Sequence, residues 1–151
     1  MTIVLGNEIL LVSMLAWLLA QTLKILLALL LGRKFSIWMI MEPGGFPSSH
    51  SALVSAMSIQ VGQKAGWGSP LFAVALILAF IVMYDAAGVR RAAGEHARFI
   101  NEMIDRLDLS HIRKDSKKVQ DEKERLKEVI GHTPFEVFGG ALLGALMGIF
   151  L

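Results

Sequence analysis

The sequence of 151 residues contains no cysteine and few charged residues. Without cysteine the chain has no disulfide framework, no thiolate nucleophile and no zinc–thiolate site. Charged residues make up 19% and hydrophobic residues 54%, whereas about a quarter of a soluble protein is charged. This composition excludes a disordered protein or one that coats nucleic acid, and it disfavours an ordinary soluble globule. The net charge of +2 indicates no polyanionic partner. The composition is that of a membrane protein.

The charged residues that are present are concentrated in one stretch. Of the 15 basic and 13 acidic residues, 20 lie between Arg90 and Glu128. The second half of this stretch is nearly all charge of mixed sign, which is typical of a solvated helix or a mobile loop. We therefore expect a single domain over residues 1–151, with a large, partly helical polar insertion at about residues 92–128. Apolar residues at helical spacing predict an amphipathic helix in its first half: Phe99, Ile100, Met103, Ile104, Leu107 and Leu109.

Apolar runs elsewhere predict helices. Residues 9–32, interrupted by Lys24, are long enough to cross a hydrocarbon core of about 30 Å. A signal peptide is the alternative, but no basic residue precedes the run and no small-residue cleavage site ends it. Residues 71–87 form a second span, 134–151 are just long enough for another, and 48–63 suit packing among neighbouring helices. The expected fold is all-α, a polytopic bundle of about four hydrophobic helices in the cell membrane.

The basic segments are expected on one side of the membrane. Arg33, Lys34 and residues 90–128 carry 13 of the 15 basic residues. The helices expected at 48–63 and 71–87 form a hairpin between them. The positive-inside rule makes that side cytoplasmic and puts both termini outside. A phosphate site would also require cations there, so the charge bias has two explanations.

Several polar residues interrupt or border the apolar runs. Lys24 lies inside one, with Gln21 one turn earlier on the same face. An ionisable residue at this depth indicates a function, although a lysine that snorkels to the boundary is an equal alternative. Asp85 precedes Arg90 and Arg91 at the end of the second span. This is either a boundary ion pair or a phosphate contact, because guanidinium binds phosphate in bidentate fashion.

The helix expected at 48–63 begins with hydroxyl groups and an imidazole. Pro47, Ser48, Ser49 and His50 follow a Gly-Gly loop. The N-terminus of a helix offers unpaired N–H groups and a positive dipole end, so it can hold an anion. An ordinary serine N-cap explains one serine. It does not explain a histidine next to it at the membrane boundary.

The last helix begins with the sequence His132-Thr133-Pro134-Phe135-Glu136. Thr133 as N-cap and Glu136 three residues later would form a capping box, and His132 would then be incidental. Alternatively, Glu136 accepts a hydrogen bond from His132 Nδ1, which selects the tautomer with a nucleophilic Nε2. Both roles require one carboxylate, and the motif alone does not decide between them.

Together these motifs resemble the superfamily of type-2 phosphatidic acid phosphatases and vanadium-dependent haloperoxidases, in particular its divergent small bacterial and plant branch. The segment Pro47–His50 is similar to the second motif, Pro-Ser-x-His, with its second serine where glycine is usual. The segment His132–Gly140 is similar to the later half of the third motif, with Glu136 in place of aspartate. Lys24 with Arg33 resembles the first motif, although the spacing is longer than usual and no proline follows Arg33.

The third motif of this superfamily also contains an arginine six residues before its histidine, and no arginine stands there before His132. In one alignment Arg90 or Arg91 supplies it, and the charged segment is an insertion. In the other alignment Arg90 and His96 keep the usual gap, and His96 is the nucleophile. We prefer the insertion because Ile100, four residues after His96, cannot orient an imidazole.

The resemblance implies a membrane phosphatase that hydrolyses a lipid or isoprenoid phosphate monoester or a pyrophosphate, without a metal or another cofactor. It implies that His132, oriented by Glu136, attacks phosphorus and forms a phosphohistidine. His50 would protonate the leaving oxygen and then activate water. The groups expected to bind phosphate are Lys24, Arg33, Ser48, Ser49, Arg90 and Arg91, with Gln21 and Asp85 as structural support.

Other functions remain open on the sequence. A non-catalytic membrane module that binds lipid phosphate or packs with other helices is compatible with the irregular first and third motifs. A vanadate-dependent oxidase fits less well because such enzymes are large and soluble. The expected partners are a membrane lipid phosphate and the bilayer, with no nucleic acid. Four helices form a thin wall around several charges, so a homodimer is also compatible with the sequence.

Overall fold

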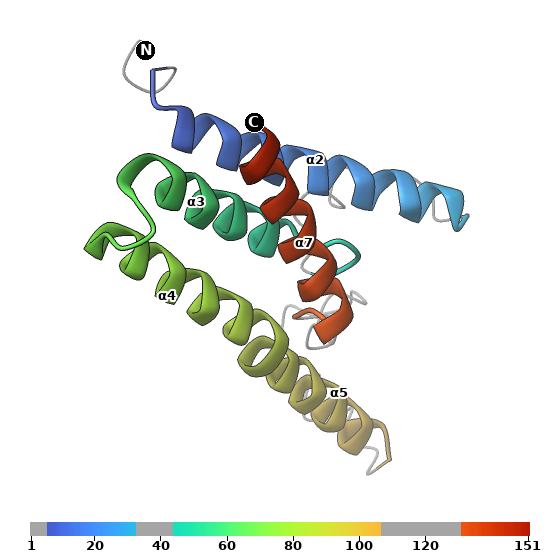
Figure 1. The fold of residues 1–151 in the computed structure, drawn as a ribbon. Coiled ribbons are helices and arrows are strands. Elements are labelled where there is room, and N and C mark those ends of the chain that lie inside the picture. The colour runs from blue at the N-terminus through green and yellow to red at the C-terminus, as the bar shows by residue number, and fades with distance from the viewer. Residues whose placement is uncertain (1–5, 33–43, 107–130) are drawn as a thin grey trace.

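The computed structural model describes residues 6–32, 44–106 and 131–151. They form helices, and no strand occurs among them (Figure 1). This agrees with the expected all-α class. Arg33 and residues 107–130, which include the charged second half of the expected polar insertion, lie outside the described residues.

Helix α2 covers Glu8–Leu30 and corresponds to the first apolar run. It begins at Asn7, whose side chain accepts the Leu10 N–H at 3.1 Å. Small residues, spaced three and four apart, let neighbouring helices approach one side of α2. Many of its leucines remain exposed. The buried residues of α2 are Val12, Ser13, Ala16, Ala20 and Gln21.

Helix α3, Ser49–Ala65, is the central element and packs against α2, α4 and α7 (Figure 1). Its N-cap is Ser48, whose side chain accepts the Ser51 N–H. The buried cluster in the middle of the bundle joins Ala56 of α3 to Val12 and Ala16 of α2. The small side chains of α3 therefore place three other helices around it at close range.

Helix α7, Pro134–Phe150, contacts α3 through a row of glycines at positions 140, 144 and 148. A Cβ atom at Gly140 would lie 2.1 Å from the Ser48 carbonyl oxygen, and one at Gly144 would lie 2.0 Å from that of Ala52. The two backbones therefore touch, as the small-xxx-small spacing predicts. This contact places the first turn of α7 beside the first turn of α3.

Helix α4, Pro70–Tyr84, continues through a π-helical turn, η2, at Asp85–Val89 into α5, Arg90–Arg106. Together they form one helix of 37 residues (Figure 1). The span predicted over residues 71–87 covers α4 and most of η2, and the helix continues beyond it into α5 without a break. Where the membrane-spanning part ends stays a prediction. No proline interrupts residues 71–106, and the π turn accommodates Gly88 without ending the helix. The predicted amphipathic helix is confirmed as α5.

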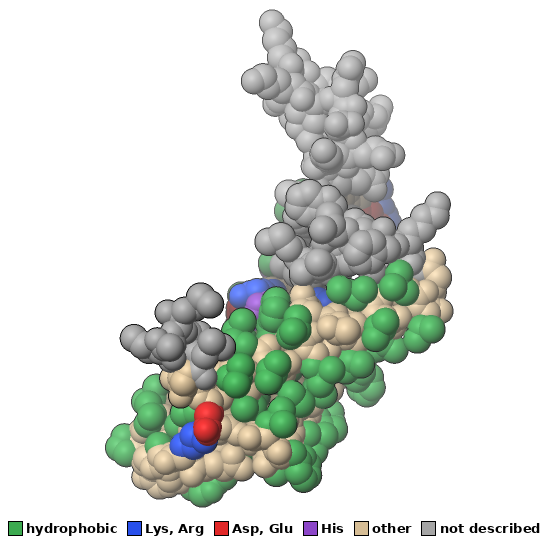
Figure 2. All heavy atoms as spheres, turned by 90° about the horizontal axis from the view of Figure 1, so that it is seen from above, with side chains coloured by type: hydrophobic (Ala, Val, Ile, Leu, Met, Phe, Trp, Pro, Cys, Tyr) green, Lys and Arg blue, Asp and Glu red, His purple; other side chains and the backbone are tan. Residues whose placement is uncertain are grey.

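The surface of the described residues is largely apolar (Figure 2). Two helices, Glu8–Leu30 and Pro70–Arg106, are long and apolar enough to cross a membrane, and Pro134–Phe150 is a shorter apolar helix. Large side chains that would be costly to expose to water point outward, among them Val74, Ile77 and Phe80. The structure therefore supports a membrane protein. The number of helices that cross the bilayer, about four by sequence, stays a prediction.

Candidate functional site

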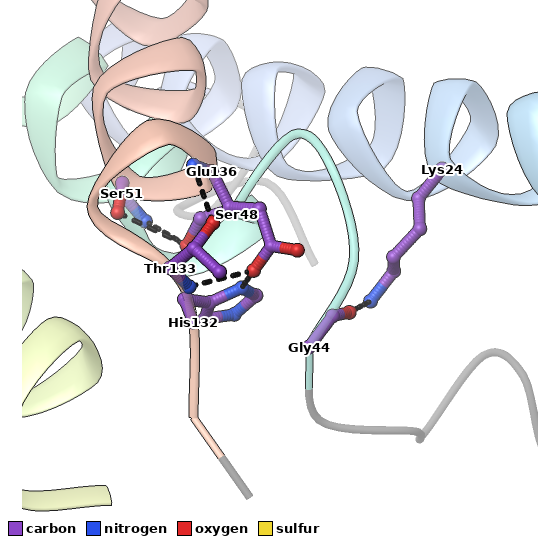
Figure 3. A network of polar contacts seen from close by, with 7 residues as sticks. All are labelled: Lys24, Gly44, Ser48, Ser51, His132, Thr133 and Glu136. Carbon is purple, nitrogen blue, oxygen red and sulfur yellow. Dashed lines mark hydrogen bonds and ion pairs between the residues drawn. The ribbon is translucent and has the colours of Figure 1, made fainter. Parts of the chain in front are cut away.

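His132 lies in the connection that leads into α7 and is 6% exposed. Its backbone N–H donates to the Ala86 carbonyl oxygen at 2.9 Å. Its ring atom Nδ1 lies 3.1 Å from Glu136 Oε2 (Figure 3). The backbone and the side chain of His132 are thus both held, which gives the imidazole a defined orientation.

Glu136 takes part in both interactions that the sequence offers as alternatives, the capping box and the hydrogen bond with His132. Its Oε2 accepts the Thr133 N–H at 2.9 Å, and Thr133 Oγ1 accepts the Glu136 N–H at 3.3 Å, which completes the capping box. The same Oε2 contacts His132 Nδ1 (Figure 3). One carboxylate oxygen has two lone pairs, so it can accept both hydrogen bonds. An ionised carboxylate only accepts, so this contact requires a proton on Nδ1, and in that tautomer Nε2 has the lone pair.

The pKa of His132 is lowered from its ordinary range. The largest cause is burial, which disfavours the charged imidazolium, and the positive charge of Lys24 acts in the same direction. The hydrogen bond to Glu136 and the charge of this carboxylate raise the pKa, as does a hydrogen bond with the Gly45 backbone, but they do not outweigh burial. At neutral pH the imidazole of His132 is therefore uncharged.

Ser48 joins the N-terminus of α3 to α7. Its backbone N–H donates to the Glu136 carbonyl oxygen at 2.9 Å. The Ser48 and Ser51 side chains are fully buried, and Ser51 Oγ donates to Ser48 Oγ at 3.0 Å (Figure 3). Ser49 is also buried, with 3% of its surface exposed. The Ser48 hydroxyl thus serves as the helix cap, which is the ordinary role that the sequence allowed for one serine.

Lys24 points from α2 toward the Gly44–Gly45 loop. Its Nζ donates to the Gly44 carbonyl oxygen at 3.2 Å (Figure 3). A Cβ atom at Gly45 would lie 2.8 Å from Lys24 Cδ, so the absent side chain of this glycine makes room for the lysine. Because the Gly45 backbone also contacts His132, the loop connects α2 with the connection before α7. Lys24 is directed into the bundle at this level.

Other cationic groups gather around the same loop. His50, in the first turn of α3, is exposed and interacts electrostatically with Arg90, His132 and Lys24. Arg90 is held from its own helix, because its Nε donates to Asp85 Oδ2 at 2.6 Å. Four groups that are or can become cationic thus converge from α2, α3, α5 and the connection before α7. A dianion has a favourable position among them.

The structure separates the remaining candidates. Arg91 forms an exposed ion pair with Glu95 at 3.1 Å, so Arg90 is the arginine that interacts with His50. His96 is exposed on α5. Gln21 is buried in the face of α2 that packs in the bundle. Among the described residues, no group of His, Asp and Glu side chains has the arrangement of a metal site.

Some contacts in the site are made by residues outside the motifs that the sequence analysis identifies. The Ala86 carbonyl, which holds His132, is one of them. Gly131 has φ +109°, and a Cβ atom there would lie 2.5 Å from Arg91 N, so the connection before α7 lies directly on the Arg90–Arg91 backbone. A glycine directly before His132 is the only sequence sign of this contact. It brings the arginine and the histidine of the insertion alignment together.

An aromatic pair connects the loop before α3 with α7. The Phe46 and Phe135 rings stack with centroids 5.1 Å apart and an interplanar angle of 19°. A Cβ atom at Gly139 would lie 2.2 Å from Phe46 Cε2, so the ring occupies the space that this glycine leaves. The pair holds the segments that carry His50 and His132 in register. It also places exposed aromatic surface next to the site, since Phe135 is 71% exposed.

Comparison with known proteins identifies the family. The family model described as "Divergent PAP2 family" matches residues 5–147. The chain belongs to this family. A relative from Bacillus subtilis (strain 168), named "Uncharacterized membrane protein YuiD", is 40% identical over 152 residues, which cover 97% of this chain and 95% of the relative. No solved structure matches. Membership in the Divergent PAP2 family confirms the resemblance, and the relative supports a location in the membrane.

Proposed function

We propose that this member of the Divergent PAP2 family is an integral membrane phosphatase. It hydrolyses a lipid or isoprenoid phosphate monoester, or a pyrophosphate, through a phosphohistidine and without a metal. The observation that carries the proposal is the contact of 3.1 Å between His132 Nδ1 and Glu136 Oε2. This contact leaves a neutral, oriented Nε2 among cationic groups, which is the arrangement that a nucleophilic histidine needs.

The reaction proceeds in two displacements. His132 Nε2 attacks phosphorus, the P–N bond forms and the P–O ester bond breaks. The bound phosphate dianion favours the protonated form of His50 against the neighbouring cations, and the leaving alkoxide takes this proton. Glu136 stabilises the positive charge on the phosphorylated imidazole. His50, now neutral, then removes a proton from water, and the resulting hydroxide attacks phosphorus. The P–N bond breaks, inorganic phosphate leaves, and His132 and His50 return to their first states.

The cations around the loop hold the phosphate and stabilise the charge that develops in the transition state. Lys24 and Arg90 approach it from α2 and α5, and the N–H groups at the start of α3 offer an anion site. Arg33, outside the described residues, and Ser49 stay candidates for the same role. The hydrocarbon tail of the substrate lies in the bilayer, beside exposed apolar side chains such as Phe135 and Phe138.

The site lies at one end of the bundle. The first turns of α3 and α7 and the end of α4 are there, whereas the ion pair between Lys64 and Glu8 joins α3 and α2 at the other end. By the positive-inside rule the end with the site faces the cytoplasm. The substrate headgroup would therefore be taken from the cytoplasmic leaflet.

A second candidate is a non-catalytic module that binds lipid phosphate. The capping box of Thr133 and Glu136 favours it, because this pair would be present in a helix with no catalytic role. Such a module would bind the phosphate between Lys24 and Arg90 but would turn nothing over. The two candidates differ in one measurable quantity, the release of inorganic phosphate.

The purified protein in detergent is expected to release inorganic phosphate from at least one of phosphatidate, phosphatidylglycerophosphate and a polyprenyl phosphate. Because protein side chains fill each role in the proposed route, the rate should persist in the presence of EDTA. A colorimetric phosphate assay across these lipids checks both expectations. Activity that disappears with the chelator would contradict the metal-free route. Binding of lipid phosphate without turnover would support the non-catalytic module.

Substituting Glu136 by glutamine is expected to move the acid limb of the kcat/KM profile to lower pH and to reduce kcat by about 10²-fold or more. The substitution keeps the capping box. It removes the carboxylate that raises the pKa of His132, so the imidazole stays neutral at more acidic pH. The rate profile between about pH 4 and 8 measures the shift.

A matched control for this experiment is Glu102→Gln, because Glu102 forms an exposed ion pair with Arg106 at 2.6 Å on α5. This variant should reproduce the wild-type pH profile and the wild-type kcat. An acid limb that stays in place in Glu136→Gln, or one that moves to higher pH, would contradict the role of Glu136 as the partner of His132.

A further inference from the structure

The long helix contains a π-helical turn at the level of the site. In this turn, η2, the Arg90 N–H donates to the Asp85 carbonyl oxygen, five residues earlier. A regular α-helix would pair the Arg90 N–H with the carbonyl of Ala86, four residues earlier. Single π turns inside α-helices are rare and occur frequently at functional sites. The turn therefore changes which backbone groups and side chains this part of the helix presents.

The first consequence concerns a backbone acceptor. Because the Arg90 N–H pairs with Asp85, the carbonyl oxygen of Ala86 is available to another donor. His132 N–H takes this position at 2.9 Å. Gly131 fits directly against the Arg90–Arg91 backbone, where a Cβ atom would come within 2.5 Å of Arg91 N. The connection that carries His132 is thus attached to the helix at the point where the turn departs from α-helical pairing.

The second consequence concerns a side chain. In an α-helix each residue turns by about 100°, so residues five apart point about 140° away from each other. A π turn needs more residues per turn and brings residues five apart onto one side. Arg90 Nε and Asp85 Oδ2 accordingly lie 2.6 Å apart. The bond to Nε leaves the two terminal nitrogens of the guanidinium for a bidentate contact with an anion.

We infer that η2 is a positioning element for the anion site, in which Asp85 is a positioning residue. The π-helical hydrogen bonding of η2 sets the direction of the Arg90 side chain. It also leaves the Ala86 carbonyl to accept the His132 N–H. Arg90 comes within electrostatic range of His50 in this register. The catalytic meaning of this inference rests on the proposed function. The geometric part concerns an inorganic phosphate group and the His132 backbone, which can be measured without turnover.

Deletion of Gly88 tests the inference, because removing one residue closes the π turn to an α-helical register. Arg90 then stands four residues after Asp85 and stays on the same side of the helix, whereas the Ala86 carbonyl takes the Arg91 N–H as its partner within the helix. Gly88→Ala is the matched control. It keeps the length of the turn, and its added Cβ meets nothing within 4 Å.

The first readout is hydrogen–deuterium exchange of the His132 backbone amide in detergent. We expect exchange to be about tenfold faster or more in the deletion variant and unchanged in Gly88→Ala, since only the deletion removes the acceptor. The second readout is the binding of inorganic phosphate by calorimetry. Its Kd should rise about tenfold in Asp85→Asn, because the guanidinium loses the carboxylate that directs it, and it should stay at the wild-type value in Gly88→Ala.

Wild-type exchange in the deletion variant, or wild-type phosphate affinity in Asp85→Asn, would overturn the inference. Equal damage in Gly88→Ala would also overturn it, because the register would then not be the cause. If the deletion variant does not fold, Asp85→Asn decides. This variant should raise KM, or the Kd for phosphate, about tenfold with little change in kcat, and Asp85→Glu should restore part of the loss. Wild-type values in Asp85→Asn would contradict the positioning role.

The outcomes separate the inference from the proposed function. If the wild type binds phosphate and shows the expected exchange pattern but hydrolyses no lipid phosphate, the proposed function fails and the inference stands. If the wild type hydrolyses lipid phosphate while the deletion variant matches it in exchange and Asp85→Asn matches it in phosphate affinity, the inference fails and the proposed function stands.

Discussion

Substitution of His132 by alanine is expected to abolish the release of inorganic phosphate from a lipid phosphate, with a loss of at least about 10⁴-fold in kcat. The proposed route forms its only covalent intermediate on His132 Nε2, and within residues 6–32, 44–106 and 131–151 no other imidazole contacts Glu136. The loss should appear in kcat, because the cations that bind the phosphate are unchanged. A phosphate assay in detergent, with saturating lipid, measures it.

His96→Ala is the matched control, since it removes the same side chain from an exposed position on α5. This variant should retain wild-type turnover. An unchanged rate in His132→Ala would refute the assignment of the nucleophile. Loss of activity in His96→Ala alone would instead support the alignment in which Arg90 and His96 keep the usual gap of the third motif.

Substitution of Gly144 by alanine is expected to lower the thermal unfolding midpoint in detergent by about 5–10 °C. The new Cβ atom would lie 2.0 Å from the Ala52 carbonyl oxygen. Backbone atoms on the facing helix cannot rotate away as a flexible side chain can, so α7 and α3 must separate. Turnover should fall as well, because the same contact aligns Ser48 with the Glu136 carbonyl.

Gly68→Ala provides the control for this experiment, because a Cβ atom at Gly68 meets nothing within 4 Å. Its unfolding midpoint should equal that of the wild type. Light scattering or tryptophan fluorescence during heating measures both midpoints. Equal midpoints in Gly144→Ala and Gly68→Ala would show that the close approach of α3 and α7 does not contribute to stability.

The sequence predicts the helices because apolar runs and capping residues act over a few neighbouring residues. Uncharged runs of helical length predict α2, α4 and α7, and the serine before α3 and the threonine before α7 mark where these helices begin. The spacing of Gly140, Gly144 and Gly148 predicts a close helix contact, although it does not name the partner helix. The continuity of α4 with α5 has no signal in the sequence, because a change from apolar to charged residues does not by itself end a helix.

The sequence predicts which residues belong to the candidate site but not how they are arranged in space. Pro47–His50 and His132–Glu136 have spacings that predict a histidine pair near an anion, and family membership supports this interpretation. The choice between Arg90 and His96 depends on residues far apart in the chain, and sequence spacing carries no information on such a contact. The structure favours Arg90 because the connection before α7 lies on its backbone.

By itself, the sequence determined a membrane helical protein, the positions of its helices and the residues from which an anion site could form, since composition and periodicity act over a few turns of chain. Only the tertiary structure decided that Glu136 serves the helix cap and His132 together, that Lys24 meets the Gly44 carbonyl, and that a π turn presents Ala86 to His132. These contacts depend on the angle and distance between helices. Such quantities follow from how glycines and small side chains pack in three dimensions.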